Sequence, residues 1–198
     1  MSKMTFTFSN LAELEKELLA IKKKSETVTK RTISDVTKRA PGWISSQIAQ
    51  EYDISKTDII KNQKHPRAAS TVTVRGETVA GIEIVYKGPL LVPYAKRFRL
   101  SPISRPATSA PYFIKATIKG GKRKTLRGKG EAIFLAGSHG KDSTSIPFQR
   151  MPDGKVTPFK TLSVPQMVTN DNVQEKIHDV LNANIEKRFN HHLNQLLK

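Results

Sequence analysis

The spacing of apolar residues changes along this chain of 198 residues from a helical repeat to a strand repeat and back again. Between 9 and 40, apolar or small residues recur every three to four positions, as on one face of a helix. Between 72 and 86 they alternate with polar residues, as in a strand, and between 173 and 196 the helical spacing returns. This order predicts an α+β fold: a long N-terminal helix, an antiparallel β-sheet with a basic hairpin, and a long amphipathic C-terminal helix.

The length of the chain favours a single domain, at roughly 150 residues per domain. We expect residues 1–198 to form one α+β domain, with a helical N-terminal part at 1–64, a β-sheet part at 71–160 and a C-terminal helix at 170–198. Pro41 and Gly42 are expected to end the first helix, and a shorter helix should follow at 43–52.

Turn residues divide the predicted sheet. Gly76 lies between two alternating segments and predicts a first hairpin, and Gly120 with Gly121 predicts the turn of a second hairpin at 112–127. Between the two hairpins, residues 87–111 contain five prolines and are expected to form a long loop. Residues 156–167 are expected to be an extended connection to the last helix.

Positive charge is concentrated in residues 71–130, about a third of the chain, which contain 13 basic and two acidic residues. The whole sequence has 34 Lys and Arg against 17 Asp and Glu, and residues 95–130 contain 11 basic residues and no acidic one. A cluster of one sign repels itself, so we expect an anion to lie beside it when the protein is in use. The residues predicted to face DNA or an acidic partner are Lys96, Arg97, Arg99, Arg105, Lys122, Arg123, Lys124, Arg127 and Lys129.

Two other readings of this cluster stay open. The charges could simply keep the outer face of a hairpin in solution. They could also belong to a free-standing nucleic-acid-binding protein. Such a protein should bind the phosphate backbone rather than stack on nucleobases, because few aromatic residues accompany the lysines and arginines.

The sequence offers little for catalysis. It has no cysteine, which excludes disulfides, thiolate zinc sites and cysteine nucleophiles, and its five histidines belong to no metal-binding motif. A nuclease would need a set of carboxylates, and the nearest candidates fit caps and solvated strand faces better. We therefore expect no enzyme, no catalytic residue, no metal and no cofactor. The carboxylates considered are Asp53, Asp58, Glu77 and Glu83.

Neither an N-terminal leader nor a membrane span is evident, since no apolar run approaches the ~18 residues that a span requires. We expect a soluble protein made in the cytoplasm.

The segment 148–167, FQRMPDGKVTPFKTLSVPQM, followed by a long helix ending RFNHHLNQLL, resembles the phage minor tail protein Z family, the lambda-type tail completion proteins. A looser likeness extends upstream to the long N-terminal helix and the GKRKTLRG strand, so it covers most of the chain. The matching residues are Phe148, Arg150, Gly154, Pro158, Ser163, Val164, Pro165, Gln166, Met167 and Phe189.

The resemblance implies a structural virion protein at the head-proximal end of a phage tail, in the neck. It implies self-association into a ring, which could be a hexamer, and contacts with the tail terminator, the tail tube and head-completion proteins. Phage DNA would pass without being read by sequence. Pro165 is expected to preset the entry to the last helix, with Val164 and Met167 packed beside it.

Overall fold

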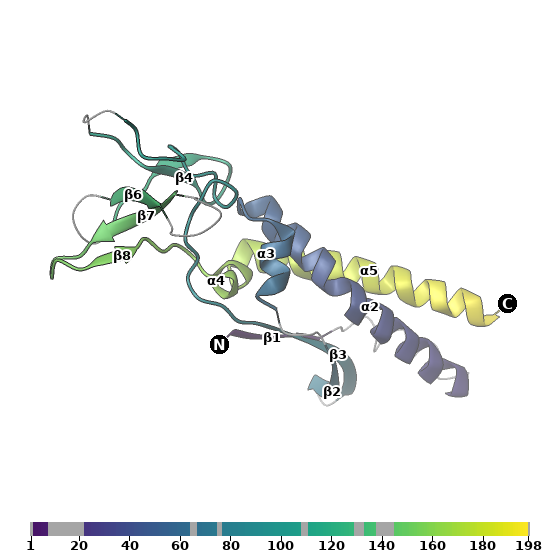
Figure 1. The fold of residues 1–198 in the computed structure, drawn as a ribbon. Helices are drawn as coiled ribbons and strands as arrows, with labels where there is room; N and C mark the ends of the chain where they lie inside the picture. Colours follow the sequence, from purple (N-terminus) through teal and green to yellow (C-terminus); the bar gives the residue numbers. More distant parts are fainter. Residues whose placement is uncertain are drawn as a thin grey trace.

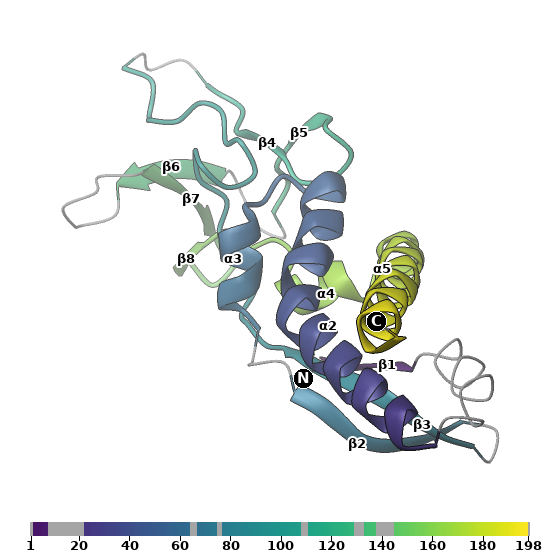
Figure 2. The ribbon, with the colours of Figure 1, turned by 90° about the vertical axis from the view of Figure 1, so that its right-hand side faces the viewer.

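The computed structural model describes residues 2–7, 22–63, 67–74, 77–107, 111–128, 133–137 and 145–197. It confirms the α+β fold. Two long helices, α2 (Lys22–Glu51) and α5 (Asp171–Leu197), lie side by side, and small antiparallel sheets gather around them (Figures 1 and 2). The helices are antiparallel, because Asp35 of α2 pairs with Arg188 of α5 while Glu51 pairs with Lys176.

Helix α2 runs through Pro41, so the prediction that Pro41 and Gly42 end the first helix is wrong. The reason is a buried stripe at every fourth residue on both sides of the proline, formed by Val28, Thr32, Val36, Ala40, Ile44 and Ile48. An interior proline costs about 3 kcal/mol. Burying one large aliphatic side chain stabilises by about 1.5–3 kcal/mol, so the stripe outweighs the proline. The predicted helical residues 9–21 lie outside the described residues.

The largest sheet has the strand order β1–β3–β2 and lies against α2 (Figure 2). β2 (Arg67–Val74) and β3 (Glu77–Tyr86) form the predicted first hairpin. β1 (Ser2–Thr7) pairs with the other edge of β3, with Ser2 opposite Tyr86. The N-terminal part, 1–64, is therefore not helical throughout. Its alternation of threonine with Met4 and Phe6 is the strand signal that the sequence analysis passed over.

Two smaller sheets lie beyond the C-terminal end of α2 (Figure 1). The predicted basic hairpin is formed by β4 (Lys115–Thr117) and β5 (Arg123–Thr125). The other sheet contains β6 (Ile133–Gly137), β7 (Ser145–Arg150) and β8 (Val156–Pro158). The segment 87–107 contains no helix or strand, as predicted for most of the loop at 87–111. It is joined to its surroundings by backbone hydrogen bonds, including those between Ser101 and Lys115.

Two short helices complete the fold. Ser55 caps α3 (Lys56–Lys61) by accepting a hydrogen bond from the Asp58 amide. The connection before α5 contains the helix α4 (Val164–Val168), so the prediction that 156–167 is extended throughout is wrong there. Ser163 and Gln166 form a capping box that starts α4.

The hydrophobic core lies between α2, α5 and the elements at their sides. α5 contributes Val173, Ile177, Leu181, Ile185 and Phe189 on one face, which confirms the predicted stripe. Across the described residues, no helix has the length and apolarity needed to cross a membrane.

Candidate polyanion-binding surface

The β4–β5 hairpin presents a row of exposed basic side chains. All three residues of β5 are exposed, including Arg123 and Lys124, and so are Lys122 before the strand and Arg127 after it. None of these four bases forms an ion pair with any acidic side chain that the structure describes. Their charges are therefore available to an external anion.

The turn of this hairpin is fixed to the end of α2. Gly120 and Gly121 have φ values of +66° and +67°, a left-handed conformation that glycine adopts without strain. The Gly120 amide donates to the Glu51 carbonyl at 3.0 Å, and Lys119 lies 3.6 Å from the Glu51 carboxylate. The basic arm thus projects from the C-terminal end of α2, the longest helix that the structure describes.

Tyr52 lies beneath this anchor. The Lys119 ammonium is 5.9 Å from the centre of the Tyr52 ring, a cation–π distance. Partial burial, with the neighbouring Glu51 carboxylate, raises the pKa of Tyr52, so its phenol stays neutral at physiological pH. The ring acts as packing for the turn.

Arg97 faces the interior of the protein. Its guanidinium lies 3.2 Å from the Asp58 carboxylate and 4.9 Å from the centre of the Tyr94 ring, and its side chain is only 18% exposed. The sequence predicts that Arg97 faces an external partner, whereas the structure pairs it with Asp58 of the same chain. Its partner Asp58 is 39 residues earlier in the sequence, so a count of acids within 95–130 could not find it.

Arg99 is also paired within the chain, but it keeps contact with solvent. Its Nε lies 3.0 Å from the Asp53 carboxylate while its side chain is 69% exposed. Phe98 and Arg99 both have positive φ, which aims the Phe98 ring into the core and Arg99 outward. The amide of Phe98 donates to the Asp53 carbonyl and holds this turn in place.

The other basic residues predicted to face DNA or an acidic partner fall into two groups. Lys96 and Arg105 are exposed on the loop, and neither pairs with an acid within the described segments. Lys129 lies outside the described residues. The cationic surface supported by the structure is therefore centred on the hairpin, with Lys122, Arg123, Lys124 and Arg127 as its main members; we call it the hairpin surface.

The structure shows where the carboxylates considered for catalysis lie. Asp53 and Asp58 are each held by an arginine, and Glu77 and Glu83 lie on β3. Within the described part of the chain, no group of three or more His, Asp or Glu side chains could hold a metal ion.

Apolar side chains are exposed beside the basic ones. Phe113 and Ile103 are 73% and 64% exposed. A depression of about 610 Å³ lies under the hairpin between Tyr112, Phe113 and Leu126, with Arg127 among its lining residues. Exposed aromatic and aliphatic groups next to charges of one sign are typical of surfaces that contact other proteins.

Most residues of the 148–167 segment have structural roles. Val164 and Met167 are fully buried, as is Phe189 of α5, and Pro165 occupies the first turn of α4. Their burial confirms the packing expected for Val164 and Met167.

On the β-sheet side of the same segment, Phe148 stacks on Phe134 and lies opposite Pro158 in the strand pairing. Arg150 is exposed and donates to the Gly154 carbonyl at the turn. These residues stabilise the turn and strand, and Arg150 is the most accessible of them.

A second basic cluster, which the sequence patterns above do not predict, combines residues of α2 and α5. Lys38 of α2 and Arg188 of α5 are 150 residues apart in the sequence, so no local pattern joins them. The signal available was the repeat of basic residues at 30–31 and 38–39, two turns apart on a helix.

Comparison with protein-family models, curated proteins and solved structures found no match to this chain.

Proposed function

We propose that this chain is a structural phage tail completion protein, located at the head-proximal neck of the tail and lacking enzymatic activity. The observation that carries the proposal is the hairpin surface. Its basic side chains are exposed, form no ion pair with the described residues, and are anchored to α2, the longest helix that the structure describes. The likeness of the 148–167 segment to tail completion proteins supports the same assignment.

In this proposal the hairpin surface lines a passage for DNA. Closed rings are the common form of homo-oligomer, and a ring would bring one hairpin from each copy around a central opening. Lysine and arginine attract phosphates without reading bases, so the passage would hold phage DNA regardless of its sequence. The exposed Phe113 and Ile103 would contact neighbouring copies or the tail terminator, tail tube and head-completion proteins.

The biological test uses a phage that encodes this chain and lacks a functional copy of its gene. Complementation with wild-type protein should restore joined heads and tails, whereas the Lys122→Glu/Lys124→Glu variant should leave a large share of them unjoined. The control, Lys56→Glu/Lys160→Glu, changes the net charge equally at exposed lysines of α3 and the β8–α4 connection. Joined, infectious particles formed without the protein would refute the proposal.

A free-standing nucleic-acid-binding protein is the second candidate, because the basic side chains of the hairpin surface are already exposed in a single chain. Binding of duplex DNA over a range of salt concentrations separates the two functions. A free-standing protein would bind tightly as a monomer, whereas a ring subunit would bind well only after assembly. In either case, Lys122→Ala/Lys124→Ala should reduce the slope of log K against log salt by about 1.8, because each lost phosphate contact contributes about 0.9.

A further inference from the structure

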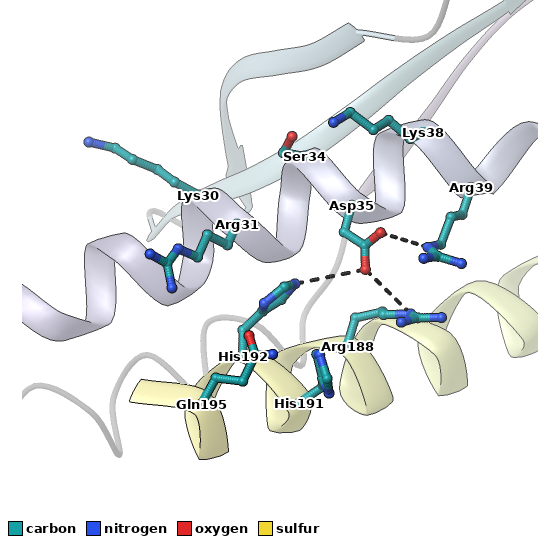
Figure 3. A pocket seen from close by; sticks show the side chains of 10 residues that line it. All are labelled: Lys30, Arg31, Ser34, Asp35, Lys38, Arg39, Arg188, His191, His192 and Gln195. Carbon is teal, nitrogen blue, oxygen red and sulfur yellow. Dashed lines mark hydrogen bonds and ion pairs between the residues drawn. The ribbon is translucent and has the colours of Figure 1, made fainter. Parts of the chain in front are cut away.

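A second cationic site lies between the two long helices, away from the hairpin surface. It is a groove of about 550 Å³ between α2 residues 30–39 and α5 residues 188–195 (Figure 3). Asp35 in this groove is 16 residues before Glu51, where the hairpin is anchored. The separation along the helix is about 24 Å at ~1.5 Å per residue. The groove and the hairpin surface are therefore distinct sites.

The groove contains far more positive than negative charge. Five of its lining residues are lysine or arginine, and Asp35 is the single acid among the described residues that line it. His191 and His192 also line it, with ring centres 5.3 Å apart. The cations are Lys30, Arg31, Lys38, Arg39 and Arg188.

Asp35 organises this site. Its carboxylate accepts a hydrogen bond from Arg39 Nε at 2.6 Å and lies 3.4 Å from Arg188 Nε and 3.8 Å from His192 Nε2, as the dashed lines in Figure 3 mark. Partial burial alone would raise the pKa of Asp35, but the hydrogen bond and the nearby positive charges hold it below its ordinary value. Asp35 thus stays ionised and holds one arginine from each helix in place.

One carboxylate cannot satisfy all three arginines of the groove. Arg39 and Arg188 approach Asp35 through Nε, and their terminal Nη groups form no hydrogen bond with the described side chains of the groove. Figure 3 shows Arg31 on the side of α2 that faces α5. Arg31 and Lys38 pair with no acid among the residues that the structure describes. The groove lining thus holds more donors than its one acid can accept from.

We propose that the α2–α5 groove binds a phosphate group, as a second phosphate site separate from the hairpin surface. Guanidinium groups present parallel N–H donors that match the oxygens of phosphate, and paired arginines bind such oxyanions better than single lysines do. The phosphate can come from a phosphodiester of DNA or from a free phosphate. This inference stands on the groove alone and does not depend on the proposed tail function.

The test measures binding at the groove directly by NMR, with the full-length protein at constant pH and ionic strength. Titration with inorganic phosphate or pyrophosphate should move the imidazole resonances of His191 and His192 and leave that of His178, outside the groove, in place. Chloride at matched ionic strength should move none of them. Absence of any movement at millimolar phosphate would overturn the proposal.

Variants check the role of the cations. Arg31→Gln/Lys38→Gln should weaken pyrophosphate binding about tenfold or more, because it removes two charge-assisted donors. The control Lys160→Gln/Lys187→Gln removes the same charge outside the groove lining and should bind like wild type. Equal affinity in the two variants would contradict the proposal, and preserved thermal unfolding midpoints would establish that both are folded.

A final arm identifies the source of the phosphate. The Lys122→Ala/Lys124→Ala protein, whose hairpin surface is weakened, is titrated with duplex DNA while the His191 and His192 resonances are followed. Movement of these resonances supports a DNA phosphodiester as the ligand. Movement with pyrophosphate alone supports a free phosphate. A failed tail function would leave both outcomes unaffected, so the two proposals can be separated.

Discussion

At the scale of single residues, the positive charges of this protein have two different uses. Arg97 is largely buried and pairs with Asp58 and Tyr94, whereas Lys122 and Lys124 are exposed and unpaired within the described residues. The first kind stabilises the fold, and the second is available for binding. A sequence count treats them alike, because it cannot see which acids the fold brings near.

We predict that Arg97→Ala lowers the free energy of unfolding by about 2 kcal/mol, because it removes a sheltered charge-assisted contact and a cation–π contact. Arg105→Ala, at an exposed loop position, should change it by less than about 0.5 kcal/mol. Urea unfolding followed by circular dichroism measures both. Equal effects of the two substitutions would show that Arg97 is not part of the fold's interior.

Asp35 gives a prediction with a pH dependence. Asp35→Asn should destabilise the protein by about 1 kcal/mol at neutral pH, since Arg39, Arg188 and His192 would lose their shared anion. The pKa of Asp35 is lowered by folding, so its contribution is present above its unfolded value of 3.8 and disappears as the pH falls through its folded pKa.

Unfolding of Asp35→Asn and wild type should therefore converge as the pH falls below about 3.8. Asp179→Asn, at an exposed position on α5, serves as the control and should match wild type at neutral pH. A difference between Asp35→Asn and wild type that persists unchanged into acid would contradict the role assigned to the ionised carboxylate.

At the scale of elements, sequence patterns predicted those whose stabilisation is local or strongly periodic. The α5 stripe and the glycine turn of the β4–β5 hairpin both depend on residues close in sequence. Three features depend on contacts between residues that are distant in the sequence. These are the continuation of α2 through Pro41, the pairing of β1 with the edge of β3, and the ion pair of Arg97 with Asp58. Tertiary burial decided these, and residue spacing alone could not reveal it.

Pro41 offers a test of that explanation. If burial of the stripe holds α2 together against the cost of the proline, Pro41→Ala should raise the free energy of unfolding by about 1–2 kcal/mol. The gain is less than the full cost of proline, because alanine leaves the unfolded chain more freedom. Urea denaturation should show it, with Gln50→Ala, exposed on the same helix, as the reference. A loss of stability would mean that Pro41 itself makes needed contacts.

At the scale of the whole molecule, two cationic regions lie at different points along the paired helices α2 and α5. The hairpin surface is anchored at the C-terminal end of α2, and the groove lies about 24 Å back along the same helix. In a ring of such subunits, the hairpin surface of each copy would face the centre, and the groove would lie at a different distance from the ring axis. Part of the chain's positive charge therefore lies in two separate regions, which can serve different anions.

The central claim is that DNA phosphates lie against the hairpin surface in the assembled particle. An electron cryomicroscopy map of the phage neck that contains this protein tests it most directly. The account predicts DNA density beside Lys122, Arg123, Lys124 and Arg127 in each copy. A map in which these four side chains extend into open solvent, with DNA elsewhere, would contradict it.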